Sequence, residues 1–290
     1  MKRFDLNGIW ELSCENIHCK GTIPGSVYSF LLDAGKMEDP YFRDNELKAL
    51  KLMDQDFCFS REFTLPADFL EECKRLILRF QGLDTICRIE INGVEVGTAC
   101  NMHRVWEYDG TGILREGENR ICVKISSPTK WIADAMEKDP IGGSIQAMRG
   151  FPHMRKAHCM FGWDWGPRLP DAGIYRDVYI FGEDSSRLEN VHIRQRHADG
   201  RVFLTVQAEQ TGTAETKITV TAPDGAVFSM ENGKECEVPS PRLWWPNGYG
   251  EQPLYTVKIA LKENGRIVDE EQKRIGLRTM TVVREKDAFG

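Results

Sequence analysis

The sequence predicts an all-β protein built from antiparallel sandwiches, and two observations support this prediction. Apolar residues recur with a period of two in short runs along the chain, as they do in strands that bury one face. Turn-forming dipeptides separate these runs, whereas segments with a helical period are scarce. Many short strands at such spacing are typical of sandwiches and not of alternating strand–helix units.

Residues 85–92 show the strand pattern most clearly. Cys87, Ile89 and Ile91 lie on one face, and Asn92-Gly93 follows as a hairpin turn before the next strand. Comparable alternation recurs in residues 120–126, 201–208, 218–220 and 255–261. We therefore expect a strand in each of these segments.

Helices are predicted in two places only, each after a proline. Residues 67–75 follow Pro66, and residues 129–138 follow Pro128. Residues 141–154 contain three glycines and a proline with little periodicity, which predicts a long loop. Long loops inside compact domains are often functional, and this one leads directly into an aromatic-rich segment.

A domain boundary is predicted at residues 182–186, where a strand-like run gives way to polar residues. The chain then divides into residues 1–184 and residues 185–290. The second part has the length of an immunoglobulin-like sandwich, roughly 100 residues.

Charge and cysteine content exclude several classes of protein. The net charge is −6 with both signs mixed along the chain, and we expect neither nucleic acid nor a membrane as a partner. No apolar run is long enough to span a bilayer. The nine cysteines are scattered without CxxC pairs, which argues against a disulfide framework and favours the cytoplasm. We expect Cys87, Cys122 and Cys159 to be buried as small apolar residues.

Residues 161–167 place two indoles around one carboxylate, as Trp163-Asp164-Trp165. Aromatic faces can cover the C–H side of a sugar ring, and a carboxylate accepts hydrogen bonds from its hydroxyl groups. The segment alone leaves a second interpretation open, in which both indoles fill a core and Asp164 caps a turn.

Motifs for cofactor or metal chemistry are absent from the sequence. We find no P-loop, dinucleotide-binding fingerprint or GxSxG elbow. His153 and the pair His158-Cys159 lack a second pair at zinc-ligand spacing, and we predict neither a metal nor a cofactor. No pair of carboxylates is recognisable as the reaction centre of a glycosidase.

Several motifs along the chain resemble glycoside hydrolase family 2 and, within it, the β-mannosidases. The most specific block is residues 155–167, followed by residues 173–178. Further matching segments are residues 6–12, 23–27, 80–84, 91–97, 243–255 and 275–279. The resemblance implies a galactose-binding-like jelly-roll sandwich, an immunoglobulin-like sandwich and then a TIM barrel with both catalytic glutamates. A barrel needs about 250 residues, and none remain here, which leads us to expect the non-catalytic part of a retaining exo-β-mannosidase, inactive alone.

The resemblance also implies roles for particular residues. Trp163 and Asp164 are expected to bind the terminal mannose of a β-mannoside, with Trp165, Arg155 and Lys156 as supports. The two basic residues either contact the sugar or pair with Asp164 and orient it. The barrel of the same polypeptide is the expected partner, and the 244–245 tryptophan pair is expected at a seam that promotes self-association when uncovered.

Two further interpretations differ in class. The chain could be a stand-alone, lectin-like sugar-binding module, or the same fragment from a β-galactosidase or β-glucuronidase relative. Residues 162–166 argue against a β-galactosidase or β-glucuronidase relative, because this block looks particular to β-mannosidases.

Overall fold

The computed structural model describes residues 2–71, 73–183 and 186–289. These residues form two compact units, which correspond to Lys2–Asp184 and Ser185–Gly290. The predicted boundary region contains residues 184 and 185, which lie outside the described part.

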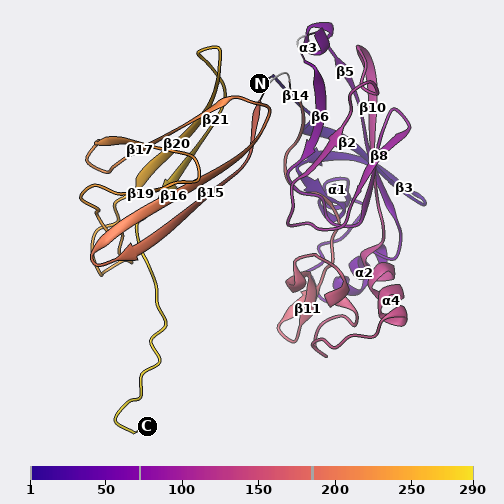
Figure 1. Cartoon of the computed structure of the whole chain (residues 1–290). Coiled ribbons are helices and arrows are strands. Elements are labelled where there is room, and N and C mark those ends of the chain that lie inside the picture. The colour runs from indigo at the N-terminus through magenta and orange to yellow at the C-terminus, as the bar shows by residue number, and fades with distance from the viewer. Residues whose placement is uncertain (1, 72, 184–185, 290) are drawn as a thin grey trace. The chain divides into compact units, whose positions relative to one another are not determined.

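The first unit is a sandwich of two antiparallel sheets (Figure 1). The larger sheet has the strand order β3-β2-β5-β10-β7-β8 and the smaller one the order β1-β14-β6-β9. The strands of the larger sheet are β2 (Gly8–Cys14), β3 (Ile17–Ile23), β5 (Phe57–Leu65), β7 (Cys87–Ile91), β8 (Val94–Ala99) and β10 (Gly117–Ile125). Those of the smaller sheet are β1 (Arg3–Asp5), β6 (Arg75–Phe80), β9 (Trp106–Asp109) and β14 (Val178–Glu183). The short pair β4 (Gly25–Ser26) and β13 (Gly173–Ile174) lies outside both sheets.

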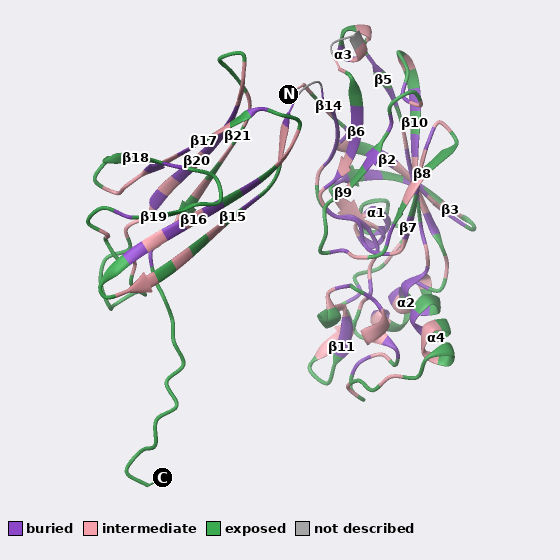
Figure 2. Cartoon of the chain, viewed as in Figure 1, coloured by how far each residue is buried: buried purple, intermediate pink, exposed green. Residues whose placement is uncertain are grey.

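The core of this unit lies between the two sheets. Ile89, Ile121 and Val123 from the larger sheet and Leu78 and Ile180 from the smaller one belong to a single buried cluster. In β7 and β10 of the larger sheet, the residues that alternate with the core positions are mostly polar and less buried (Figure 2). The smaller sheet does not alternate in this way, because Ile77, Tyr179 and Phe181 on its other face are buried as well. The period-two prediction is confirmed here, because β7 and β10 occupy the segments in which it was clearest.

The hairpin turn at Asn92-Gly93 has the geometry that the sequence predicts. Ile91 pairs with Val94, and the two residues between them have φ angles of 51° and 81°. Both central residues of a type I′ turn need positive φ, which asparagine and glycine tolerate best. The turn therefore fixes the register of β7 against β8.

The second unit is also a sandwich of antiparallel strands. A three-stranded sheet has the order β15-β16-β19 and a four-stranded sheet the order β18-β17-β20-β21. The strands are β15 (Arg187–Ala198), β16 (Arg201–Thr211), β17 (Glu215–Thr221), β18 (Val227–Met230), β19 (Glu235–Glu237), β20 (Tyr255–Glu263) and β21 (Arg266–Ile275). Apolar residues from both sheets, including Leu204, Val206, Val257 and Ile259, form the core.

The helices agree with the sequence only in part. α4 (Pro128–Lys138) confirms the second predicted helix, and the Ser127 hydroxyl caps it by accepting from the Lys130 amide at 3.1 Å. The first predicted helix was too long, since α3 covers only Ala67–Glu71 and Arg75 already begins β6. Residue 72 of that prediction lies outside the described part.

Two helices in the first unit were not predicted. They are α1 (Val27–Asp33), which begins with a capping box between Ser26 and Ser29, and α2 (Asn45–Leu52). Helices α2 and α4 lie with strand β11 at one end of the unit, opposite α3 (Figure 1). That end carries the candidate functional site.

Candidate functional site

A short hairpin presents the tryptophan-rich segment at the end of the first unit. Strand β11 (Phe161–Trp163) pairs with β12 (Gly166–Arg168), and Trp163 lies opposite Gly166. Asp164 and Trp165 are therefore the two connecting residues at the tip. The fractional exposure is 37% for Trp163 and 80% for Trp165, and Asp164 is also exposed. The interpretation that both indoles fill a core is wrong.

The two indoles form one continuous apolar surface beside a free carboxylate. Their ring centroids are 5.2 Å apart at an interplanar angle of 40°. The Asp164 carboxylate makes no hydrogen bond or ion pair with any residue in the described part of the chain. It therefore caps no turn, and its oxygen atoms remain able to accept hydrogen bonds from a ligand.

Apolar packing holds the base of the hairpin in place. Phe161 is fully buried in a small cluster with Ile132 of α4 and Met154. Two backbone hydrogen bonds tie the strands to neighbouring segments: Met148 donates to the Phe161 carbonyl at 3.0 Å, and Leu169 donates to the Met160 carbonyl at 2.9 Å. The indoles are thus exposed on a base that is itself anchored.

Gly162 is required by the path of β11. Its φ is +82°, in the region that favours glycine, and a Cβ atom there would lie 2.5 Å from Cγ of Arg168. The backbone amide of Arg168 in turn donates to Glu46 of α2 at 2.8 Å. The hairpin therefore contacts α2 through Arg168. The same residue leaves no room for a side chain at Gly162.

Lys156 lies inside the sandwich and not beside Asp164. Its side chain is fully buried, and its ammonium group pairs with the Asp84 carboxylate and donates to the carbonyl of Asp171. The expected pairing of Lys156 with Asp164 is therefore wrong, because this cation is already neutralised by a carboxylate in the core. The contact joins the loop before the hairpin to the sandwich.

Arg155 has the opposite orientation and is exposed. Only its main chain is anchored, since its carbonyl accepts from the Met102 amide at 3.0 Å. Its guanidinium group has no ion-pair partner within the described residues, which means that the expected pairing with Asp164 is not formed here either. Arg155 thus stays available to a ligand or to another part of the protein.

Asp84 and Asp171 are structural residues that the sequence analysis did not single out. Asp171 accepts hydrogen bonds from the amides of Tyr28 at 3.1 Å and Ala172 at 2.8 Å. Burial raises the pKa of Asp171 to about 6, against the opposing effect of these hydrogen bonds and of the Lys156 charge. Asp84 lies in the matching segment 80–84, and Asp171 lies between two matching segments, which does not reveal that both contact one lysine.

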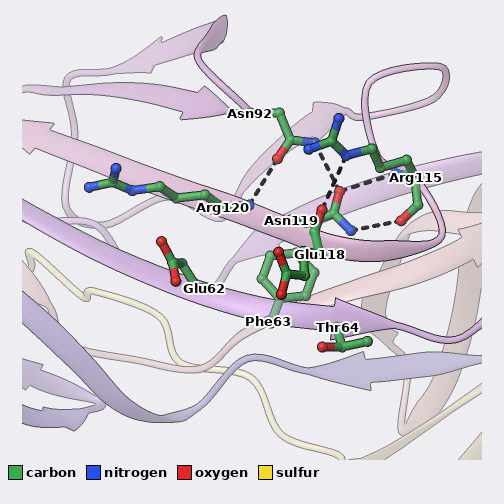
Figure 3. A pocket seen from close by; sticks show the side chains of 8 residues that line it. All are labelled: Glu62, Phe63, Thr64, Asn92, Arg115, Glu118, Asn119 and Arg120. Carbon is green, nitrogen blue, oxygen red and sulfur yellow. Dashed lines mark hydrogen bonds between the residues drawn. The ribbon is translucent and has the colours of Figure 1, made fainter.

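A polar hollow of about 420 Å³ elsewhere on this unit has a structural explanation (Figure 3). Asn92 donates to Asn119 at 2.9 Å, and Asn119 donates to the Arg115 carbonyl at 2.7 Å. The Arg120 amide donates to Asn92 at 2.8 Å. These amide side chains hold the turns on which they lie, and their hydrogen-bonding capacity is used within the protein.

Residues 2–71, 73–183 and 186–289 contain no cluster that could hold a metal ion, because no group of three or more histidine, cysteine, aspartate or glutamate side chains converges there. No helix in these ranges has the length and apolar character needed to cross a bilayer.

Comparison with known proteins decides the family. The profile described as "Glycosyl hydrolase 2 galactose-binding domain-like" matches residues 10–176, which is more than half of the chain. The profile described as "Glycosyl hydrolases family 2" matches residues 186–278. The chain belongs to glycoside hydrolase family 2. Together with the two sandwiches, these matches confirm the predicted jelly-roll and immunoglobulin-like fold.

The relatives of this family 2 chain are named β-mannosidases. It is 28% identical to beta-mannosidase B of Emericella nidulans, over 93% of this chain and 34% of the relative. Beta-mannosidase of Mus musculus is 26% identical, over 97% of this chain and 35% of the relative. Our chain thus spans about a third of the length of these relatives.

Two solved structures also match this chain along almost its whole length. The beta-D-mannosidase from Dictyoglomus thermophilum matches with a TM-score of 0.86 at 28% identity, over 96% of this chain and 36% of that one. A beta-glucuronidase from an uncultured Clostridium sp. matches with a TM-score of 0.66 at 19% identity, over 97% of this chain and 45% of that one. The second likeness shows the family 2 fold alone.

Proposed function

We propose that this chain is the N-terminal, non-catalytic part of a retaining exo-β-mannosidase. Its hairpin would form one wall of the pocket for the terminal, non-reducing mannose. The observation that carries the proposal is the exposed pair Trp163 and Trp165 around an unpartnered Asp164 carboxylate. This surface occurs in a chain whose relatives from a fungus and a mammal are named β-mannosidases.

The hairpin is suited to hold a sugar and not to cleave it. An indole face covers the C–H side of a pyranose ring, and a carboxylate can accept from two hydroxyl groups at once. When a neighbouring domain excludes water from the site, the lower local dielectric strengthens these hydrogen bonds. Arg155 is an exposed cation without an ion-pair partner among the described residues, and it would contact either the sugar or the adjoining domain.

Cleavage requires groups that the two sandwiches do not provide. A retaining glycosidase holds two carboxyl groups about 5–5.5 Å apart at the scissile bond. The sheets of residues 2–71, 73–183 and 186–289 are antiparallel sandwiches, and no (β/α)8 barrel is present among these residues. The nucleophile and the acid/base would therefore come from a barrel in the same polypeptide.

Replacement of Asp164 in a polypeptide that also carries the barrel tests the role of the hairpin. Asp164→Ala should lower kcat/KM for an aryl β-mannoside by about 10- to 100-fold, since hydrogen bonds to a charged group contribute about 1.5–3 kcal/mol. The thermal midpoint should stay unchanged, because the carboxylate is exposed and unpaired. Glu209→Ala on the exposed face of β16 is the matched control and should change neither quantity. Full activity of the Asp164 variant would show that this residue lies outside the sugar pocket.

The 290-residue chain itself separates the proposal from a lectin-like module. It should give no turnover of an aryl β-mannoside, and it should bind free mannose weakly or not at all, because one wall is a small part of a pocket. Calorimetric titration with mannose measures the second point. Binding in the micromolar range would favour the stand-alone module, and measurable hydrolysis would contradict the absence of a reaction centre.

A further inference from the structure

Two cysteines lie side by side on the outer face of the larger sheet. Cys58 on β5 and Cys122 on β10 are half-buried, whereas their neighbours Phe59 and Val123 point into the core. In the register of the two strands, Cys58 is opposite Lys124 and Cys122 is opposite Ser60, which makes the cysteines diagonal neighbours.

The two sulfur atoms are already in contact. The Sγ–Sγ distance is 2.6 Å, with both thiols free. No strand has to move for the side chains to meet, since β5 and β10 are hydrogen-bonded along their whole length.

The surroundings give the two thiols different roles. The pKa of Cys58 is lowered to about 7, first by the hydrogen bond from Cys122 and further by the positive charges of Lys124 and Arg120. The pKa of Cys122 is raised, first by the hydrogen bond with Cys58 and then by burial, with Glu90 adding to the effect. Cys58 also lies directly opposite Lys124 in the ladder, and this cation favours a thiolate at Cys58.

We propose that Cys58 and Cys122 are an oxidisable dithiol that closes to a cross-strand disulfide when a peroxide is present. The Cys58 thiolate attacks one peroxide oxygen, the O–O bond breaks, and a sulfenic acid forms on Cys58. The other oxygen leaves as hydroxide, which takes up the proton that the Cys58 thiol released on ionising and becomes the first water. The Cys122 sulfur then attacks the Cys58 sulfur, and the sulfenic oxygen departs as a second water with the Cys122 proton. Overall, two thiols and one hydrogen peroxide give one disulfide and two waters.

Four other cysteines lack this combination of a sulfur partner and a reactive thiolate: Cys14, Cys19, Cys100 and Cys159. Cys14 and Cys19 are both buried, and burial raises the pKa of each, that of Cys14 to about 11. Cys159 is exposed, contrary to the sequence prediction, and Cys100 is exposed as well. Neither exposed thiol has a sulfur partner among the described residues, which include all nine cysteines. Exposure alone would therefore give sulfenic or higher acids at these two positions and no internal link.

A disulfide between Cys58 and Cys122 would cross-link β5 and β10, the two central strands of the larger sheet. The residues are 64 positions apart in the sequence, and a cross-link over a long loop restricts the unfolded chain. We therefore expect oxidation to raise the thermal midpoint of the first unit without changing its fold.

Peptide mapping of the intact 290-residue chain tests the proposal. The folded protein is treated with an equimolar amount of hydrogen peroxide, its remaining thiols are alkylated, and it is digested without reductant. The expected product is a peptide pair joined through Cys58 and Cys122, with a thermal midpoint that falls back after reduction. Cys159→Ser is the control variant and should leave the link unchanged.

Two single variants assign the order of attack. Cys122→Ser should accumulate a sulfenic acid at Cys58 that dimedone traps, whereas Cys58→Ser should leave Cys122 reduced. Oxidation of Cys100 or Cys159 while Cys58 and Cys122 stay reduced in the wild-type chain would overturn the proposal. A link that forms only in denaturant would overturn it as well, and both results are read from the wild-type map even if a variant fails to fold.

Discussion

A single buried ammonium group joins three segments of the first unit. Lys156 contacts the side chain of Asp84 and the carbonyl of Asp171, and burying a charge costs several kcal/mol unless it is paired and hydrogen-bonded. Lys156 follows Arg155 in the sequence, and the resemblance implies that both support Asp164. The fold separates them, because adjacent residues of an extended, bridged segment point to opposite sides, one into the sandwich and one to solvent.

Asp171 should make the stability of the chain depend on pH. Burial raises its pKa to about 6 in the folded state, above the 3.8 of an unperturbed aspartate, and the folded state therefore binds this proton more tightly than the unfolded state. The free energy of unfolding then decreases as pH rises between these two values and levels off above the folded pKa. We expect Asp171→Asn to abolish this decrease in the free energy of unfolding, which totals about 3 kcal/mol between the two pH values. Urea unfolding of both proteins at several pH values measures the difference.

Asp164→Asn is the control for this titration. Its carboxylate is exposed and unpaired, and its curve should run parallel to that of the wild type. A wild-type slope that persists in the Asp171 variant would show that another group titrates in this window.

At the scale of elements, β11 and β12 depend on one glycine. Gly162→Ala places a Cβ atom against Arg168 at a positive φ, and we expect the hairpin to loosen at a cost of about 1–3 kcal/mol. Hydrogen exchange at the Met148 and Leu169 amides, which anchor the hairpin, should accelerate. Gly166→Ala is the matched control, because no atom lies within 4 Å of its Cβ position. Equal exchange rates in both variants would contradict the steric argument.

Strands were predictable because burial on one face imposes its own period. The segments around Ile89, Ile121 and Leu204 alternate in sequence and lie in β7, β10 and β16. Short helices were not, since a helix of seven or eight residues such as α1 or α2 has too few turns to show a period. The first predicted helix was too long because Arg75 begins β6, where it lies opposite Glu183 of β14, and no local pattern contains that long-range pairing.

At the scale of the whole molecule, the candidate site was predictable where it is local. Trp163, Asp164 and Trp165 are consecutive, so the sequence reveals the cluster. It left open whether the indoles are exposed or fill a core, and the structure shows them exposed on one hairpin. Lys156 and Asp84 are 72 positions apart in the sequence, and no local pattern indicates that residues so far apart form a pair. The chain spans about a third of the length of its relatives, and the proposed sugar pocket would need residues outside both units.

The second unit has an apolar surface that we expect to mediate self-association of the isolated chain. A hollow of about 280 Å³ is lined by Leu243, Trp244 and Trp245 together with Leu277 and Met280. Trp244 is held by a backbone hydrogen bond to Leu277, whereas Trp245 is 48% exposed. Contiguous exposed apolar surface of this kind promotes association, and a tryptophan at the centre of an interface contributes about 2 kcal/mol or more.

Trp245→Gln should therefore weaken dimers by at least about tenfold in sedimentation equilibrium, since every 1.4 kcal/mol is a factor of about ten. Trp165→Gln is the control, because Trp165 is an equally large and more exposed indole on the other unit, with 80% of its surface accessible. If association depends on general hydrophobicity, both variants will weaken it alike. If it depends on the hairpin, only the Trp165 variant will weaken it. A wild-type chain that stays monomeric at all concentrations would contradict the role of this surface.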